Sequence, residues 1–309
     1  MKFKQTKSIV IYFLLISVGL LFSGCKKTEY VWYVHPEFER VWTNIIRNAP
    51  KPAMKIQVWE EGEIPTGPGV YITAKHRQSG ETKANVYYRL SYDLEYQGAA
   101  VLALDPWMIF RKYRNPELTA ARAYPETGGN GLLLIPGKEP AYVNAWIARL
   151  IQERPGEFPS DEQMWQDWEK KLFTGSRFSQ GAQTYNLQEA LFRLMGNQPA
   201  WFYAPLSAIR RYRDPNKAIL EAVPFPEINA GSQYSLQAKL LWALPTGSEK
   251  EKKKLTAVMK WLKRPETQTI IADAIEWIPA DPYGKPYDPM CMVSHRNWLT
   301  ASFIYDLNE

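Results

Sequence analysis

Residues 240–280 read LLWALPTGSEKEKKKLTAVMKWLKRPETQTIIADAIEWIPA, and this stretch decides the fold prediction. It predicts a short buried strand, a turn, and two helices. Leu255, Val258, Met259 and Leu262 follow the i, i+3, i+4, i+7 spacing, so one face of the first helix is apolar while its lysines stay in water. Pro265 suits the first turn of the second helix, where a missing N–H has no partner to lose. The stretch therefore predicts helices that pack against a core.

Upstream segments supply the sheet that such helices would cover. Residues 30–34 and 54–59 predict strands, and Pro36 starts a helix with an apolar face between them. A strand, a helix and a strand within about 30 residues form a βαβ unit, which favours a parallel sheet. Residues 98–104 (GAAVLAL) are a continuous apolar run, expected to form a central parallel strand that ends before Asp105-Pro106-Trp107.

Composition limits the class of protein. A chain of 309 residues with 45% hydrophobic content is long enough for two domains. The formal charge of +6 includes Lys2, Lys4 and Lys7, so the chain from residue 25 onward carries +3. No arginine-rich arm accompanies this charge, and no nucleic-acid partner is expected. The 12 Trp, 18 Tyr and 12 Phe residues fit either a large aromatic core or a ligand site that uses ring faces.

The N-terminal sequence predicts where in the cell the protein is located. An apolar run at residues 9–22 follows the three lysines and is shorter than the roughly 20 residues of a membrane-spanning helix. It ends in Leu21-Phe22-Ser23-Gly24-Cys25, which resembles a bacterial lipoprotein lipobox, although Phe22 stands where leucine is usual. The resemblance implies a signal peptide at residues 1–24, lipidation of Cys25, and a membrane-anchored tether at residues 25–29. The body would then face the periplasm or the exterior of the cell envelope. Ordinary secretory cleavage that leaves a free Cys25 is the alternative.

Two parts of the chain resemble a known family. The first comprises the strand ending in Ala-Leu-Pro, the Trp-Leu-Lys helix core, the Pro-Glu-x-Gln helix start and the closing Ile-Pro-Ala of residues 240–280. The second comprises the helix between Asn186 and Gly196, followed by QPAWFYAP (residues 198–205) and AVPFP (residues 222–226). Both resemble the family 1 extracellular solute-binding proteins of ABC importers, the maltose-binding-protein-like group.

The resemblance implies an α/β, two-lobed periplasmic-binding-protein-like fold of type II. Each lobe would be a mostly parallel sheet flanked by helices, with a trimmed second lobe. Lobe 1 would comprise residues 30–136 and 237–282, and lobe 2 residues 137–236 and 283–309. Such a protein is a monomeric receptor without a cofactor. It closes around a small ligand, here preferably a carbohydrate, and delivers it to ABC permease subunits.

Candidate ligand residues stand at the predicted strand ends. Ligands of open α/β sheets bind outside the carboxyl ends of strands. Sugars offer apolar C–H faces to aromatic rings and hydroxyls to polar groups. The candidates are His35, Asp105, Trp107, Lys138, Tyr142, Tyr203, Tyr234, Trp277 and, in the terminal segment, Trp298. A core role is the alternative for each; Asp105, for example, could cap the helix that follows it, with Trp107 packed beneath that helix.

Catalytic and metal motifs are missing from the sequence. The histidines His35, His76 and His295 have no metal-ligand spacing, and there is no Gly-x-Ser-x-Gly elbow or phosphate-binding glycine loop. No enzymatic activity and no metal are therefore expected. Two alternatives to a sugar receptor stay open. One is a receptor for another solute, such as a polyamine or an anion. The other is a surface lipoprotein that keeps the fold but acts in adhesion or in a protein complex.

Overall fold

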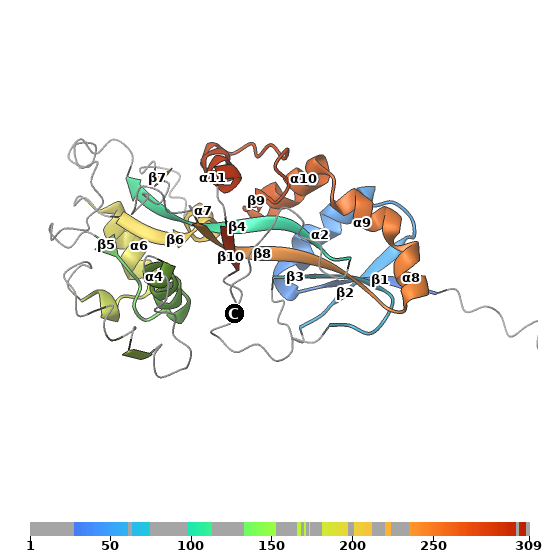
Figure 1. The fold of residues 1–309 in the computed structure, drawn as a ribbon, viewed down its shortest axis with the longest axis horizontal. Helices are drawn as coiled ribbons and strands as arrows, with labels where there is room; N and C mark the ends of the chain where they lie inside the picture. Colours follow the sequence, from blue (N-terminus) through green and yellow to red (C-terminus); the bar gives the residue numbers. More distant parts are fainter. Residues whose placement is uncertain are drawn as a thin grey trace, which may run out of the picture.

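The computed structural model shows an elongated molecule along which two long strands run (Figure 1). It describes residues 28–60, 64–74, 98–112, 133–152, 166–167, 170, 173, 181–196, 201–211, 220–223, 235–300 and 303–306. Within these residues, no helix is long and apolar enough to cross a membrane. Cys25, Tyr234 and most of residues 61–97 lie outside the described residues.

Three short parallel strands build the N-terminal part of the sheet. β1 (Tyr30–Val34) lies between β2 (Met54–Val58) and β3 (Gly69–Thr73), and both neighbours run parallel to it. The βαβ prediction is therefore confirmed. The connection between β1 and β2 holds the short helices η1 (Pro36–Phe38), α2 (Glu39–Ile45) and η2 (Ile46–Asn48).

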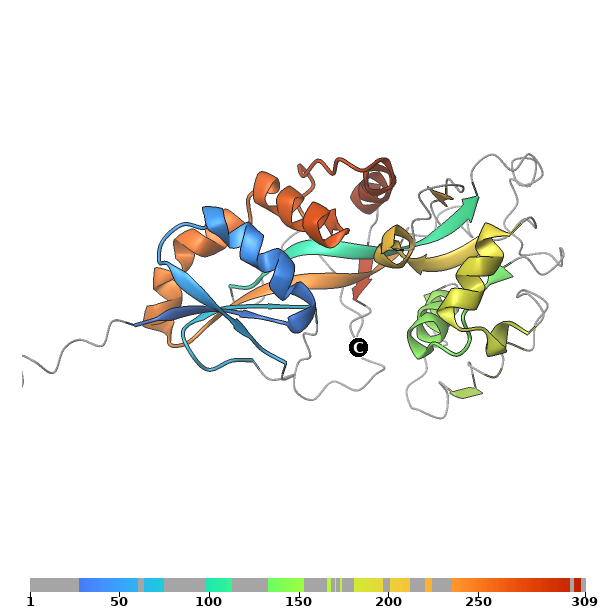
Figure 2. The same ribbon diagram turned by 180° about the vertical axis from the view of Figure 1, so that it is seen from behind.

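The C-terminal helices cover the same face of this sheet as α2. They are α8 (Glu249–Lys254), α9 (Thr256–Leu262) and α10 (Pro265–Ile275), and Figure 2 shows them beside α2. Leu255, Val258 and Leu262 are fully buried, and Met259 is nearly so, as their spacing predicted. Pro265 occupies the first turn of α10, also as predicted. The helices of residues 249–275 are thus packing elements of one core.

Two long antiparallel strands connect this part to the rest of the molecule. β4 (Ala100–Lys112) pairs with β8 (Ser235–Thr246) as far as Pro106, and from Trp107 it pairs with β6 (Trp201–Pro205) instead. The prediction that the strand ends at Leu104 was wrong, and so was the prediction that it is parallel, because β4 runs antiparallel to both β8 and β6. Proline cannot donate a ladder hydrogen bond, but Pro106 stands where the pairing partner changes, and the buried residues on both sides keep the chain extended. Asp105 and Trp107 therefore lie inside a strand.

The second part of the sheet lies beyond this change of partner. β5 (Leu133–Leu134) runs parallel to β6, and β7 (Leu220–Val223) runs antiparallel to β4. The helices here are α4 (Pro140–Gln152), η4 (Ala182–Thr184), α6 (Leu187–Met195) and α7 (Leu206–Arg211). Asn186 and Glu189 form the capping box predicted for α6, with reciprocal bonds of 2.9 and 2.8 Å.

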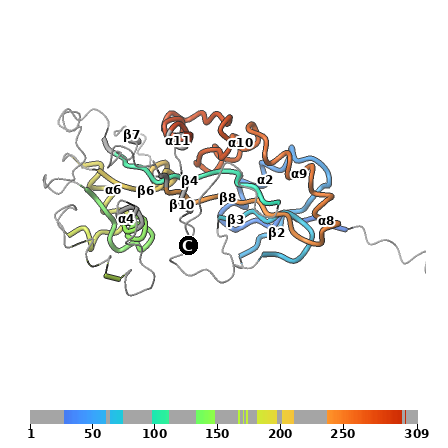
Figure 3. Tube along the Cα trace, in the orientation of Figure 1, coloured from blue at the N-terminus to red at the C-terminus, as the bar shows by residue number. Residues whose placement is uncertain are grey.

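The chain returns to the middle of the molecule at its C-terminal end (Figure 3). β9 (Ile278–Pro279) pairs with β4, α11 (Pro289–Thr300) follows, and β10 (Phe303–Asp306) runs parallel to β8. The predicted α/β fold class is confirmed. The lobe boundaries at residues 136 and 236 stay predictions, and the change of pairing partner at Pro106 lies within the predicted lobe 1.

Candidate functional site

The carboxyl ends of β1, β2 and β3 point toward the second part of the sheet. Thr73, the last residue of β3, pairs with Trp242 of β8, and the first residue Gly69 pairs with Thr246. Moving from residue 246 to residue 242 along β8 leads toward Ala238, where β4 changes partner. In open α/β sheets this edge of the strands is where ligands bind. The carboxyl edge of β1–β3 is therefore the candidate solute site.

Trp59 is the aromatic residue that this edge presents. It follows β2 directly, and its backbone N–H donates to the carbonyl of Val34 at 3.0 Å. Its ring is partly buried and meets the ring of Tyr33 edge to face, with centroids 5.6 Å apart. Burial also raises the pKa of Tyr33. Trp59 was not among the predicted ligand residues because strand β2 was expected to include it; its position next to a strand end is the signal that identifies it.

His35 is the one predicted ligand residue at this edge. It follows β1, its N–H donates to the carbonyl of Ile72 at 3.2 Å, and its ring Nδ1 accepts a 3.4 Å bond from the backbone of Glu37. His35 thereby begins η1 and holds the ends of β1 and β3 together. A ring that is neither buried nor fully exposed leaves it able to contact a ligand at the same edge.

Three predicted ligand residues meet in one buried aromatic cluster beyond the change of partner. The ring of Trp107 lies 4.9 Å from that of Tyr142 and 5.4 Å from that of Tyr203. Trp146 packs on Tyr203 at 5.0 Å, and Phe202 stacks on Tyr142 at 5.8 Å. Every one of these side chains is at most 7% exposed. The structure gives them packing roles, and the ligand contacts expected of them stay predictions.

Some polar groups inside this cluster have internal partners, whereas Nε1 of Trp107 and Nε2 of Gln237 are buried without a hydrogen-bond partner among the described residues. The hydroxyl of Tyr203 donates to Oε1 of Gln237 at 2.7 Å. Burial, followed by the carboxylates of Asp105 and Glu139, raises the pKa of Tyr142 well above its usual value. Its hydroxyl therefore stays protonated near Asp105. Gln237 was missed from the sequence because nothing near residue 237 indicates that its amide is buried.

Asp105 connects β4 to α7. It is 2% exposed, and its carboxylate accepts bonds from the backbone N–H and the hydroxyl of Ser207, at 2.9 and 2.6 Å. The alternative that Asp105 caps the helix directly following it was wrong, because the chain continues there as a strand; the carboxylate binds the first turn of α7 instead. The helix concerned begins about 100 residues later in the chain, which the local sequence could not indicate.

Of the remaining predicted residues, the two whose side chains the structure describes, Trp277 and Lys138, lie apart from both groups. Trp277 is buried in the core under α10, edge to face with Phe38 at 6.0 Å. Lys138 is exposed in the turn before α4, where its N–H donates to the carbonyl of Tyr185 at 3.0 Å. The backbone of Trp298 lies in α11, but its side chain is outside the described atoms, as is all of Tyr234. The site roles of these four residues stay predictions.

A buried ionic cluster links α7 to the C-terminal segment. Nη2 of Arg210 lies 3.8 Å from Oδ2 of Asp288, and both side chains are at most 15% exposed. Asp273 of α10 faces the same cluster. Burial raises the pKa of Asp273, whereas a hydrogen bond from the backbone of Tyr287 and the charge of Arg210 oppose that rise. We call the place where β4 changes its pairing partner, at Pro106 and Trp107, the strand crossing. The ionic groups join elements on the two sides of it.

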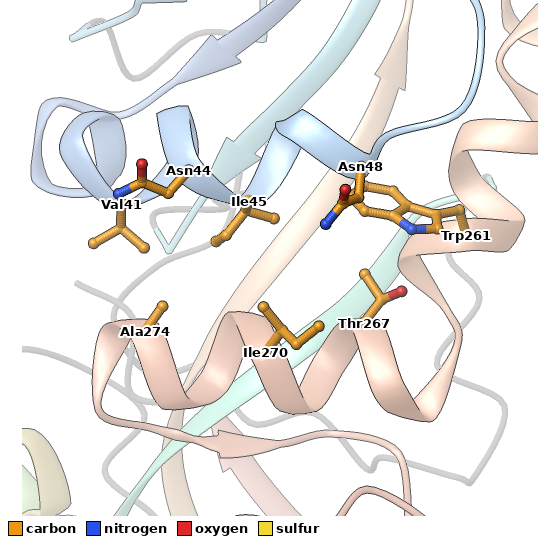
Figure 4. Close-up of a pocket in the computed structure, with 8 residues that line it drawn as sticks. All are labelled: Val41, Asn44, Ile45, Asn48, Trp261, Thr267, Ile270 and Ala274. Atoms are coloured by element: carbon orange, nitrogen blue, oxygen red, sulfur yellow. The ribbon is translucent and has the colours of Figure 1, made fainter.

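A separate groove lies between α2 and α10, on the outer face of the helices (Figure 4). It encloses about 290 Å³ and is lined mainly by apolar side chains, including Val41, Ile45, Trp261 and Ile270. Among the described residues, no group of three or more His, Cys, Asp or Glu side chains could hold a metal ion.

Solved structures resemble this arrangement over most of its length. A family 1 extracellular solute-binding protein from Bifidobacterium longum subsp. infantis superposes with a TM-score of 0.60 at 11% identity, covering 92% of this chain and 89% of its own. The bacterial solute receptor AcbH, described as having an exclusive preference for β-D-galactopyranose, gives 0.62 at 11% identity and coverages of 90% and 87%. RafE from Streptococcus pneumoniae gives 0.57 at 14% identity and coverages of 91% and 89%.

Comparisons of sequence alone find no similar protein or family. No protein-family model matches the chain, and no curated protein matches it. At identities of 10–14% the structural likeness establishes the fold. The chain therefore has the type II fold of the family 1 extracellular solute-binding proteins, as its sequence resemblance predicted.

Proposed function

We propose that this protein is a solute-binding receptor that takes a carbohydrate at the carboxyl edge of β1–β3 and delivers it to an ABC permease. The observation that carries the proposal is the half-buried ring of Trp59 at this edge, packed edge to face against Tyr33. A ring held in place by Tyr33 offers a fixed apolar face to the C–H face of a sugar.

The connection between the two parts supports a closing motion. Among the described strands, β4 alone pairs in both parts of the sheet, and β8 runs beside it as far as the change of partner. Hinge motions in such proteins are absorbed by a few residues. Residues 105–107 and 237–239 stand where the pairing changes. Bending there would bring the second part over the carboxyl edge and enclose a ligand. Several of the similar structures are named as sugar receptors, which agrees with a sugar ligand here.

Anchoring completes the proposal. Lipidation at Cys25 would hold the receptor at the cell envelope, five residues before β1 begins. A permease in the same membrane would then receive the closed form.

Ligand screening by thermal unfolding tests the function. Galactose, raffinose, chitin oligosaccharides, polyamines and amino acids would each be added to the purified protein. A ligand at 100 times its Kd stabilises the native state by about 2.7 kcal/mol, and isothermal titration should give one site per chain. Stabilisation by polyamines or amino acids alone would replace the sugar with another solute. If no solute binds, the receptor proposal fails and the alternative of a surface lipoprotein without transport gains support.

A further inference from the structure

One end of the molecule concentrates its positive charge. Residues 249–264, which form α8, α9 and the turns that follow them, hold seven basic residues and two glutamates. Their net charge of +5 exceeds the +3 of the whole chain from Cys25 onward, so the rest of that chain is net negative. We call this segment the basic end. Its exposed basic side chains are Lys250, Lys253, Lys254, Lys260 and Arg264.

The two glutamates of the basic end are already engaged. Oε2 of Glu251 accepts bonds of 2.8 and 2.7 Å from the backbone N–H and the hydroxyl of Ser248, and these bonds lower the pKa of Glu251. Glu249 pairs with Lys252 at 3.0 Å. The exposed lysines around them therefore make this surface positively charged.

The basic end lies where the chain would approach its anchor. Gly247, just before α8, has a φ of +95°, and a Cβ there would meet Cα of Pro68 at 2.9 Å. The carbonyl of Pro68 in turn accepts a 3.1 Å bond from the N–H of Val31, at the start of β1. Figure 1 shows α8 at the outer end of the molecule, beside the beginning of β1. Only four residues lie between Cys25 and Tyr30, so the two are at most about 18 Å apart.

We propose that the basic end docks on anionic phospholipid headgroups of the membrane that holds the anchor. The partner is a lipid surface, because a mobile layer of phosphate groups suits dispersed flexible lysines and needs no shaped pocket. Each Lys or Arg near an anionic membrane strengthens binding by roughly fivefold, and the attraction falls off within a Debye length of about 10 Å. This inference rests on the anchoring part of the proposed function.

Docking in this way would orient the solute site. β1 runs from the basic end toward the strand crossing, so its carboxyl edge stands about 13 Å farther along the strand. The candidate site with Trp59 would then face away from the bilayer surface, toward the second part of the molecule. An anchor alone leaves the body free to rotate, whereas charge contact selects one orientation.

Lysine footprinting tests the docking. The processed, full mature protein would be reconstituted on phosphatidylcholine vesicles and on vesicles with one-third phosphatidylglycerol, then labelled briefly with an amine-reactive reagent and analysed by mass spectrometry. We expect labelling of Lys250, Lys253 and Lys254 to fall about fivefold on the anionic vesicles and to recover in 0.5 M salt. Labelling of Lys170 and Lys285, which are exposed and lie outside the basic end, should not change.

Matched variants control for the fold. In the Lys253→Gln, Lys254→Gln protein the protection of Lys250 should be lost, while Lys170→Gln, Lys285→Gln should leave it intact. Equal labelling on the two vesicle types overturns the proposal, as does protection that appears only when membrane proteins are added. If the protein dissociates from neutral vesicles but its lysines are still protected on anionic vesicles, the lipid anchor is refuted and the docking surface is supported.

Discussion

Asp105 and Ser207 are 102 residues apart in the chain, and the carboxylate of one accepts both polar hydrogens of the other, at 2.9 and 2.6 Å. Asp105 belongs to β4 at the point where that strand leaves β8 for β6, and Ser207 lies in the first turn of α7. The contact fixes α7 to the strand crossing. Any closing motion that bends residues 105–107 must keep or break this pair of bonds.

Removing the carboxylate should destabilise the fold. In Asp105→Ala, two buried donors of Ser207 lose their acceptor, at about 1–3 kcal/mol each, so we expect the free energy of unfolding to fall by roughly 3 kcal/mol. Urea denaturation measures this change. Ser207→Ala removes only the hydroxyl bond and should cost less, and the two losses should not add in the double variant. A loss below 0.5 kcal/mol in Asp105→Ala, taken as roughly the scale of neutral surface changes, would contradict the role given to this contact.

The bond between Tyr203 and Gln237 predicts a partial rescue. Tyr203→Phe leaves Oε1 of Gln237 buried without this donor and should cost about 1–3 kcal/mol. Replacing both partners, as in Tyr203→Phe with Gln237→Leu, removes the stranded polar group and should recover part of the loss. Chemical denaturation of the single and double variants decides the matter. A double variant that is less stable than the sum of the singles would show that the amide has another essential contact.

Solute binding should depend on the ring of Trp59. Trp59→Ala removes the flat face at the carboxyl edge, and we expect Kd for the best ligand to rise about tenfold, the equivalent of about 1.4 kcal/mol. Trp59→Phe should keep part of the affinity. Trp261→Ala is the matched control, because Trp261 is a similarly half-buried tryptophan in the groove between α2 and α10. Titration calorimetry that finds Trp261→Ala the more damaging change would move the site to that groove.

His295 should make the protein less stable in mild acid. Burial lowers the pKa of His295, although the nearby carbonyl of Asp281, 3.2 Å from Nε2, opposes the shift. Because the unfolded chain takes up this proton at a higher pH than the folded chain does, stability falls as the pH drops from the usual histidine pKa toward the lowered one. Thermal midpoints between pH 8 and pH 5 measure the slope.

A substitution isolates the histidine from other acid effects. His295→Gln keeps a side-chain donor that can face the carbonyl of Asp281 but cannot titrate. Its thermal midpoint should therefore decline less than that of the parent over the same pH interval. An identical decline in both proteins would assign the acid sensitivity to other groups.

Local patterns account for the elements that were predicted correctly. The apolar spacing from Leu255 to Leu262, Pro265 in the first turn of α10, and the Asn186–Glu189 box each involve residues within two turns of one another. Spacing and capping act over such distances, so they can be recognised in one segment. They also supported the family resemblance that the structure confirmed at the level of fold.

The sequence by itself determined which segments form these helices and strands, because each contains its own apolar face and its own caps. Only the tertiary structure decided that β4 continues through Asp105 and Trp107, since its extension depends on β6, which lies about 90 residues away. The same holds for the site. Aromatic residues at expected strand ends became core when distant helices covered them, whereas Trp59 remained at an edge because its neighbours leave one part of its ring open. Burial is a property of the assembled layers, and no single segment determines it.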